Sequence, residues 1–203
     1  KNIPGKWDDQ AIWPSTLLKD NTNTWHLFYT GTNNENNQQQ IGLATSKNLL
    51  KWKRLDQPIL TMTGPAQHFY HNTMHDPHVF PHPTRTGWMM TFAAQAKTHT
   101  TPKGCIGLAT SQDLHNWTLE KPITITPFKA IEHPQILFHN GEWYAIISTI
   151  AENWTDAVQT LHNTKPTDSI HILKSKTLTE GWRLLSILTQ NLYAGKIIKT
   201  PSN

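Results

Sequence analysis

Short runs of aromatic and β-branched residues alternate along this chain with clusters of Gly, Asn, Thr and Pro. Apolar runs bounded by turn residues in this way predict strands. No segment keeps an apolar repeat of 3.6 residues, so helix is expected to be minor. The polar stretch 150–169 is predicted to be a surface loop. The pattern as a whole predicts an all-β fold.

A twelve-residue pattern occurs twice almost letter for letter, at Ile41–Trp52 and Ile106–Trp117, and returns in weaker form from Ile170 to Trp182. The copies follow one another after roughly 65 residues. Each is preceded by an aromatic run and, before that, by an apolar run. A fourth apolar run, Leu192–Ile198, is expected to open another repeat as a strand. The tryptophan that closes each copy is expected to lie in the core.

Four antiparallel strands in each repeat are typical of a propeller blade. A β-sandwich also contains many short strands, but it does not require the same residues at the same phase of a long repeat. We therefore expect a single, partial β-propeller domain over 1–203, with approximate blades at 7–60, 74–124 and 130–188 and the start of a further blade at 191–203.

Two carboxylates stand at the predicted entrances of two first strands. Asp76 lies in His75-Asp76-Pro77, and Glu132 lies in Glu132-His133-Pro134. First strands line the channel of a propeller, so both acids are expected to face the same hollow. Glycoside hydrolysis needs such a pair, since one carboxyl group protonates the leaving oxygen and another attacks or activates water. The plainer alternative is that both acids cap turns; their recurrence in successive repeats favours function.

Several of these motifs resemble the five-bladed furanosidase propellers of glycoside hydrolase families 32, 43 and 68. Leu27–Gly31 and Gln40–Ser46 are similar to their second blade, His75-Asp76-Pro77 resembles their Arg-Asp-Pro motif, and Glu132-His133-Pro134 resembles their Glu-Cys-Pro or Glu-Gly-Pro motif. The resemblance implies five blades, of which about three are present here.

By that resemblance Glu132 is the general acid/base, and Asp76 stabilises the transition state or tunes the pKa of the acid. Trp13, at the mouth of the first strand present, would face the substrate, and His75 and His133 would donate hydrogen bonds to sugar hydroxyls or to the carboxylates. The implied function is hydrolysis of furanosides, with a β-fructofuranoside ahead of the arabinofuranosides and xylosides of family 43.

The chain also departs from the family pattern. His75 stands where the motif has a permanently charged arginine, and no Asn-Asp-Pro-Asn-Gly-type motif supplies the first-blade aspartate that acts as nucleophile or base. Asp8 and Asp9 are weak substitutes because they precede Trp13 by four or more residues. The sequence is expected to be part of a longer glycosidase, or else a truncated relative that self-associates to cover its sheet edges. A non-catalytic carbohydrate-binding propeller is the alternative from another class.

Composition limits the kinds of partner that we expect for this chain. The net charge of +4 is spread along the chain without a basic block, which argues against nucleic acid, and no run approaches 18 apolar residues, which argues against a membrane span. Five clustered histidines invite a zinc interpretation, but the prolines among them prevent a continuous helix, so we expect no metal and no other cofactor. They are His68, His71, His75, His78 and His82. The cellular compartment stays open.

Overall fold

The computed structural model describes residues 3–98 and 102–198. Most of them belong to three four-stranded antiparallel sheets, in each of which the strands follow chain order. Sheet A contains β1 (Ala11–Lys19), β2 (Trp25–Thr32), β3 (Gln39–Ser46) and β4 (Lys53–Arg54). Sheet B contains β5 (Tyr70–Pro81), β6 (Trp88–Ala96), β7 (Lys103–Ser111) and β8 (Trp117–Ile125). Sheet C contains β9 (Glu132–His139), β10 (Glu142–Thr149), β11 (Ser169–Ser175) and β12 (Arg183–Gln190).

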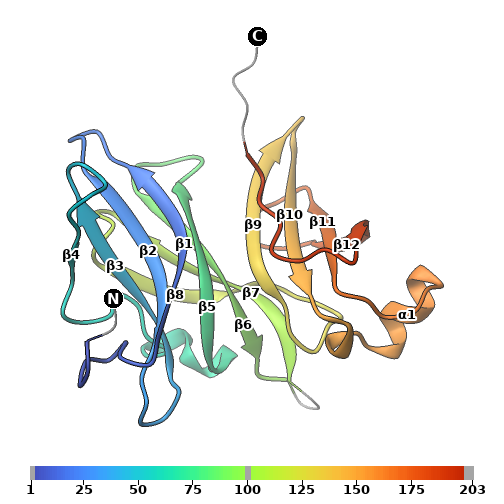
Figure 1. Cartoon of the computed structure of the whole chain (residues 1–203). Helices are drawn as coiled ribbons and strands as arrows, with labels where there is room; N and C mark the ends of the chain where they lie inside the picture. Colours follow the sequence, from blue (N-terminus) through green and yellow to red (C-terminus); the bar gives the residue numbers. More distant parts are fainter. Residues whose placement is uncertain (1–2, 99–101, 199–203) are drawn as a thin grey trace.

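These three sheets have the arrangement of propeller blades, as the repeats predict. The first strand of sheet B contacts the first strands of both other sheets, so β1, β5 and β9 lie together at the inner edge (Figure 1). One apolar cluster joins sheets A and B, and a second joins sheets B and C. The all-β propeller prediction is confirmed.

The glycine of the repeated pattern is explained by packing across strands. Gly42 pairs with Tyr29, and Gly107 pairs with Phe92. A Cβ atom on Gly107 would lie within 2.1 Å of the Phe92 ring, and one on Gly42 within 2.3 Å of the Tyr29 ring. The aromatic ring therefore occupies the space that a side chain would need. In sheet C the pair becomes Ile147 and His171, which is why the third copy of the pattern is weaker.

The outer turn between the third and fourth strands also repeats. In sheet A the Ser46 hydroxyl accepts from the Leu49 amide at 2.9 Å, and in sheet B the Ser111 hydroxyl accepts from the Leu114 amide at 3.0 Å. The indole of the closing tryptophan donates to a carbonyl of the same turn in all three sheets. Trp52 is 37% exposed, so the expectation that these tryptophans form the core is wrong for the first of them. Through these hydrogen bonds the three tryptophans hold the turn in place.

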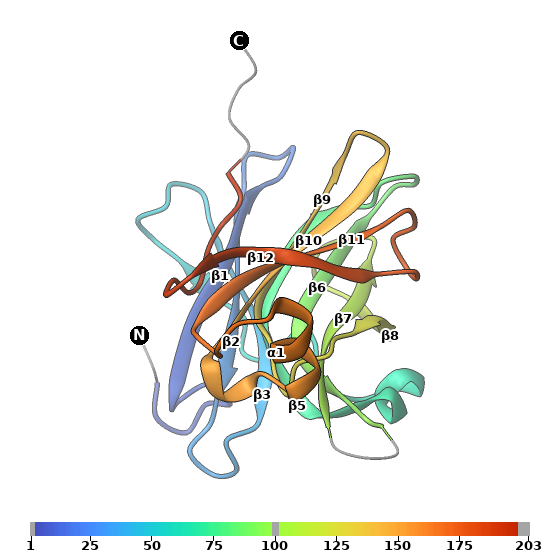
Figure 2. The ribbon, with the colours of Figure 1, turned by 90° about the vertical axis from the view of Figure 1, so that its right-hand side faces the viewer.

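Two further segments differ from the expectations. The stretch 150–169 is not all loop, because it contains a short helix, α1 (Asp156–His162) (Figure 2). Thr155 caps this helix by accepting from the Val158 amide. A 3₁₀ turn, η2 (Ala151–Asn153), precedes α1 in the same stretch, and another, η1 (Pro65–Phe69), lies between β4 and β5. The predicted strand Leu192–Ile198 forms no strand, and residues 199–203 lie outside the described residues. None of the helices described is long and apolar enough to cross a bilayer.

Candidate active site

All three first strands contain a bulge, with one extra residue against the neighbouring strand. His75 and His78 pair with Ala93 and Thr91, so three residue steps on β5 face two on β6. On β1, the three steps from Trp13 to Thr16 likewise face two steps on β2. On β9, the three steps from Glu132 to Gln135 face two steps on β10. Trp13, His75 and Glu132 are thus equivalent positions of three blades. Asp76 corresponds to His133, one residue further along.

The bulges correct the expectation that both acids stand at strand entrances. Glu132 begins β9, but β5 begins at Tyr70, so Asp76 lies inside its strand. The backbone is left-handed at the bulge, with φ of 56° at Asp76 and 49° at His133. Such a conformation costs a residue other than glycine on the order of 1–2 kcal/mol. It turns consecutive side chains of each bulge toward the neighbouring blade.

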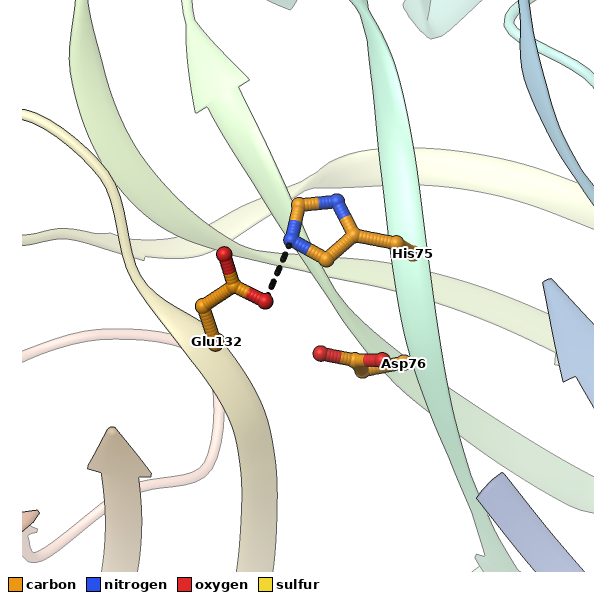
Figure 3. A group of neighbouring side chains, drawn as sticks. All are labelled: His75, Asp76 and Glu132. Atoms are coloured by element: carbon orange, nitrogen blue, oxygen red, sulfur yellow. Dashed lines mark ion pairs between the residues drawn. The ribbon is translucent and has the colours of Figure 1, made fainter. Parts of the chain in front are cut away.

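The two bulges form crossed pairs of one acid and one histidine, as Figure 3 shows for the first pair. His75 on β5 reaches Glu132 on β9, with Nε2 3.5 Å from Oε2. Asp76 on β5 reaches His133 on β9, whose backbone amide donates to Oδ2 at 2.9 Å and whose Nδ1 lies 3.2 Å from the same oxygen. The histidines predicted to accompany the carboxylates therefore do so, each on the opposite strand.

The carboxylates differ in their exposure to solvent. The Asp76 side chain is 7% exposed, and the backbone amide of Asp76 donates a hydrogen bond to the Thr30 hydroxyl. The Glu132 side chain is 34% exposed. One nitrogen of His75 and one oxygen of each acid lie within 4.8 Å of one another, and this is the only group of three metal-ligating side chains among the described residues. It contains one of the five clustered histidines.

Electrostatics favour charge separation in the pair of His75 and Glu132. Burial opposes ionisation of Glu132, but contacts with His75 and with Tyr193 outweigh it and hold the pKa of Glu132 below its ordinary value. Burial also opposes protonation of His75, yet Glu132 and the nearby Asp76 raise its pKa above the ordinary value. Each residue of the pair thus favours the charged form of the other.

His78 links the same two strands in a different way. Its side chain is half-buried, and Nδ1 accepts from the Ile136 amide at 3.2 Å. Burial lowers the pKa of His78 to about 4, and Lys196 adds to the shift. A neutral histidine thus joins β5 to β9 just beyond the bulges and fixes the distance between the two acids. Thr16 joins β1 to β5 similarly, because its hydroxyl donates to the Pro77 carbonyl at 2.6 Å.

Tyr193 is a site residue that sequence reasoning did not find. Its hydroxyl group lowers the pKa of Glu132, and its ring lies edge-on to His133 with the ring centres 5.7 Å apart. Gln135 holds the segment in place, since it donates to the Gly195 carbonyl at 2.7 Å and accepts from the Ile197 amide at 2.9 Å. The only available signal was an apolar run without a chemical motif.

The other predicted residues lie as follows. Trp13 occupies the bulge position equivalent to Glu132 and is 46% exposed, so its ring has a free face. Asp8 is fully buried inside sheet A, where Tyr29 donates to it at 2.9 Å and Arg54 pairs with it at 3.1 Å. Asp9 accepts from the amides of Gly5 and Asn34. Neither aspartate joins the group around Glu132.

Blades whose inner strands carry two carboxylates and two histidines define an acid-bearing β-propeller, the architecture used by furanoside-acting glycoside hydrolases. Residues 3–139 match the model of the glycosyl hydrolases family 32 N-terminal domain. The chain belongs to glycoside hydrolase family 32. The comparison with curated protein sequences gave no significant match.

Solved structures support the fold at low sequence identity. Inulosucrase from Halalkalicoccus jeotgali bound to kestose is 18% identical, with a TM-score of 0.70 over 91% of this chain and 52% of its own. The catalytic domain of Microbacterium saccharophilum K-1 β-fructofuranosidase is 15% identical, with a TM-score of 0.67 over 90% and 47%. Bacillus subtilis levansucrase is 16% identical, with a TM-score of 0.68 over 88% and 53%. The chain spans about half the length of these proteins.

Proposed function

We propose that this chain supplies the acid/base part of an active site that hydrolyses furanosides, most closely β-fructofuranosides. The observation that carries the proposal is the approach of the Asp76 and Glu132 carboxylates to within 4.8 Å, from equivalent bulges of two blades. The family match and the fructoside-acting proteins among the solved structures support the substrate class.

The environments of the two acids suit different roles. Glu132 is partly exposed and can reach a glycosidic oxygen, so it acts as general acid/base. The His75 imidazole, 3.5 Å away, is placed to exchange a proton with it. Asp76 is held rigidly by the His133 amide and is almost enclosed. A fixed buried carboxylate stabilises positive charge that develops on the sugar ring.

Hydrolysis assays with matched variants test this proposal. Sucrose, inulin and nitrophenyl arabinofuranoside are the substrates, and they are tested with the chain and with any longer protein that its gene encodes. We expect Glu132→Gln to lower kcat by roughly two to four orders of magnitude. Glu142→Gln is the control, since Glu142 pairs with Lys174 at 2.6 Å elsewhere on sheet C, and its turnover should be unchanged.

Two outcomes contradict the proposal. A Glu132→Gln protein with full turnover would remove Glu132 from the chemistry. Sugar binding without turnover by the verified full-length protein would favour the non-catalytic carbohydrate-binding propeller. One observation supports that alternative, because the third member of the group around Glu132 is a histidine and not a third acid.

A further inference from the structure

One buried nitrogen of the site has no hydrogen-bond partner. His75 Nδ1 lies 3.2 Å from Gln39 Oε1, and a carbonyl-type oxygen accepts only from a protonated nitrogen. A neutral His75 therefore keeps its lone pair on Nε2. That atom is buried and makes no hydrogen bond within the described part of the chain. It is directed at Glu132 Oε2, 3.5 Å away.

The distance between His75 Nε2 and Glu132 Oε2 suits a pair of metal ligands better than a hydrogen bond. A hydrogen bond between nitrogen and oxygen is typically 2.7–3.2 Å long, whereas two ligands of a tetrahedral zinc ion, each about 2.1 Å from it, are roughly 3.4 Å apart. Asp76 supplies a third donor, and the three atoms lie within 4.8 Å of one another. A small inward movement of the third donor completes one face of a coordination shell.

Each of the three donors is also oriented by a second residue. Gln39 accepts from His75, the His133 amide donates to Asp76, and Tyr193 lies beside Glu132 and lowers its pKa. Metal sites show this arrangement, in which an outer hydrogen bond fixes the tautomer of a ligating histidine and the rotamer of a ligating carboxylate. Figure 3 shows His75 and Asp76 converging from β5 on Glu132, which comes from β9.

We propose that His75, Asp76 and Glu132 form a binding site for one divalent transition-metal ion of the zinc class. One imidazole nitrogen and two carboxylate oxygens make a donor set that suits zinc, and three protein ligands leave the fourth position open toward the channel. A bound ion is coordinated by Glu132, the carboxylate that a glycosidic oxygen would need. Metal binding and sugar binding therefore exclude each other. The metal site uses the residues of the hydrolytic proposal but does not depend on hydrolysis, and it departs from the expectation, from sequence, of no metal.

The test measures Zn²⁺ binding by calorimetry in the absence of sugar. We expect the unaltered chain to bind one equivalent and His75→Arg to bind at least 100-fold more weakly. Arginine keeps a positive charge beside Glu132 but has no lone pair to offer a metal. His68→Gln is the matched control, since His68 is an exposed histidine outside the group, and its binding should be unchanged.

Two further readouts guard against surface binding and misfolding. Four-coordinate Co²⁺ absorbs strongly in the visible range, and this absorption should appear in the unaltered chain and be lost in Glu132→Gln. Circular dichroism and urea unfolding confirm that each variant is folded. Equal Zn²⁺ affinity in the unaltered chain and His75→Arg would overturn the proposal. Because no sugar is present, that result would leave the hydrolytic proposal untouched.

Discussion

The outer turns and the inner bulges of the blades differ in what is repeated from one blade to the next. At the outer turns the residues repeat. The Ser46 hydroxyl accepts from the Leu49 amide, and the Ser111 hydroxyl accepts from the equivalent amide of Leu114. At the inner bulges the register shift repeats but the residues differ, with Trp13, His75 and Glu132 at one equivalent position. Repeated residues therefore mark the scaffold, and different residues at a repeated register shift mark the site.

The energetics of the two ends differ in the same sense. An outer turn is satisfied by its own neighbours within a few residues. An inner bulge places left-handed backbone at Asp76 and His133, and its side chains find their partners on another blade. Substitutions at the inner end should thus change the chemistry, and substitutions at the outer end should change only stability.

Among the comparisons of inner and outer ends, the largest effect is expected at Asp76. Asp76→Asn keeps the shape of the side chain but removes the buried charge that faces the sugar, so sugar turnover should fall by roughly 100-fold or more. Asp20→Asn is the outer-end control, since Asp20 accepts from the amides of Thr22 and Thr24 in the hairpin between β1 and β2. It should lower the free energy of unfolding and leave turnover unchanged. Equal turnover in the two variants would contradict the comparison.

Much of the scaffold could be predicted from the sequence because it depends on local, repeated chemistry. The Gly42 and Gly107 positions, the closing tryptophans and the turn serines all recur at one phase, and the sheets follow from them. The exposure of Trp52 was missed, because position in a repeat does not say how deeply a ring is covered. Helix α1 was missed because seven residues are too few to show a helical period.

Only part of the site could be predicted in the same way. Asp76, Glu132 and their neighbouring histidines were visible because each pair sits beside a proline. The crossing of the pairs was not visible, since it depends on bulges whose extra residue appears only in the strand register. Tyr193 reaches Glu132 from a segment 61 positions later through contacts that carry no sequence motif.

Two exposed tryptophans offer the next comparison. Trp13 is 46% exposed at an inner bulge, and Trp52 is 37% exposed at an outer turn. An aromatic ring stacked on a partner contributes on the order of 1 kcal/mol, so Trp13→Ala should weaken binding of a fructose oligosaccharide by roughly fivefold to tenfold. Trp52→Ala should leave the affinity unchanged and destabilise the fold, because its indole donates to the Leu49 carbonyl at 3.0 Å. Calorimetry with the sugar, together with urea unfolding, distinguishes the two.

The smallest expected effect is on stability, in a comparison of two outer turns. One contains Asn48, and the other has the charged Asp113 at the equivalent position. Asn48 accepts from the amides of Leu50 and Lys51 at 3.0 Å, and Asp113 accepts from the equivalent amides of His115 and Asn116 at 2.9 and 2.8 Å. Bonds from the Asn116 backbone and side chain, with smaller contributions from His115 and Ser111, hold the pKa of Asp113 below its ordinary value against a small opposing effect of burial.

The pH dependence of stability should therefore differ between these turns. A carboxyl group whose pKa is lowered by folding stabilises the protein above its unfolded pKa, about 3.9, and loses that contribution as the pH falls. Near neutral pH, Asp113→Ala and Asn48→Ala should each cost roughly 1 kcal/mol, the modest value expected for exposed turns. Below about pH 4 the cost of Asp113→Ala should shrink while that of Asn48→Ala stays constant, as measured by urea unfolding across pH. A parallel decline for both variants would show that the acid sensitivity lies elsewhere in the blades.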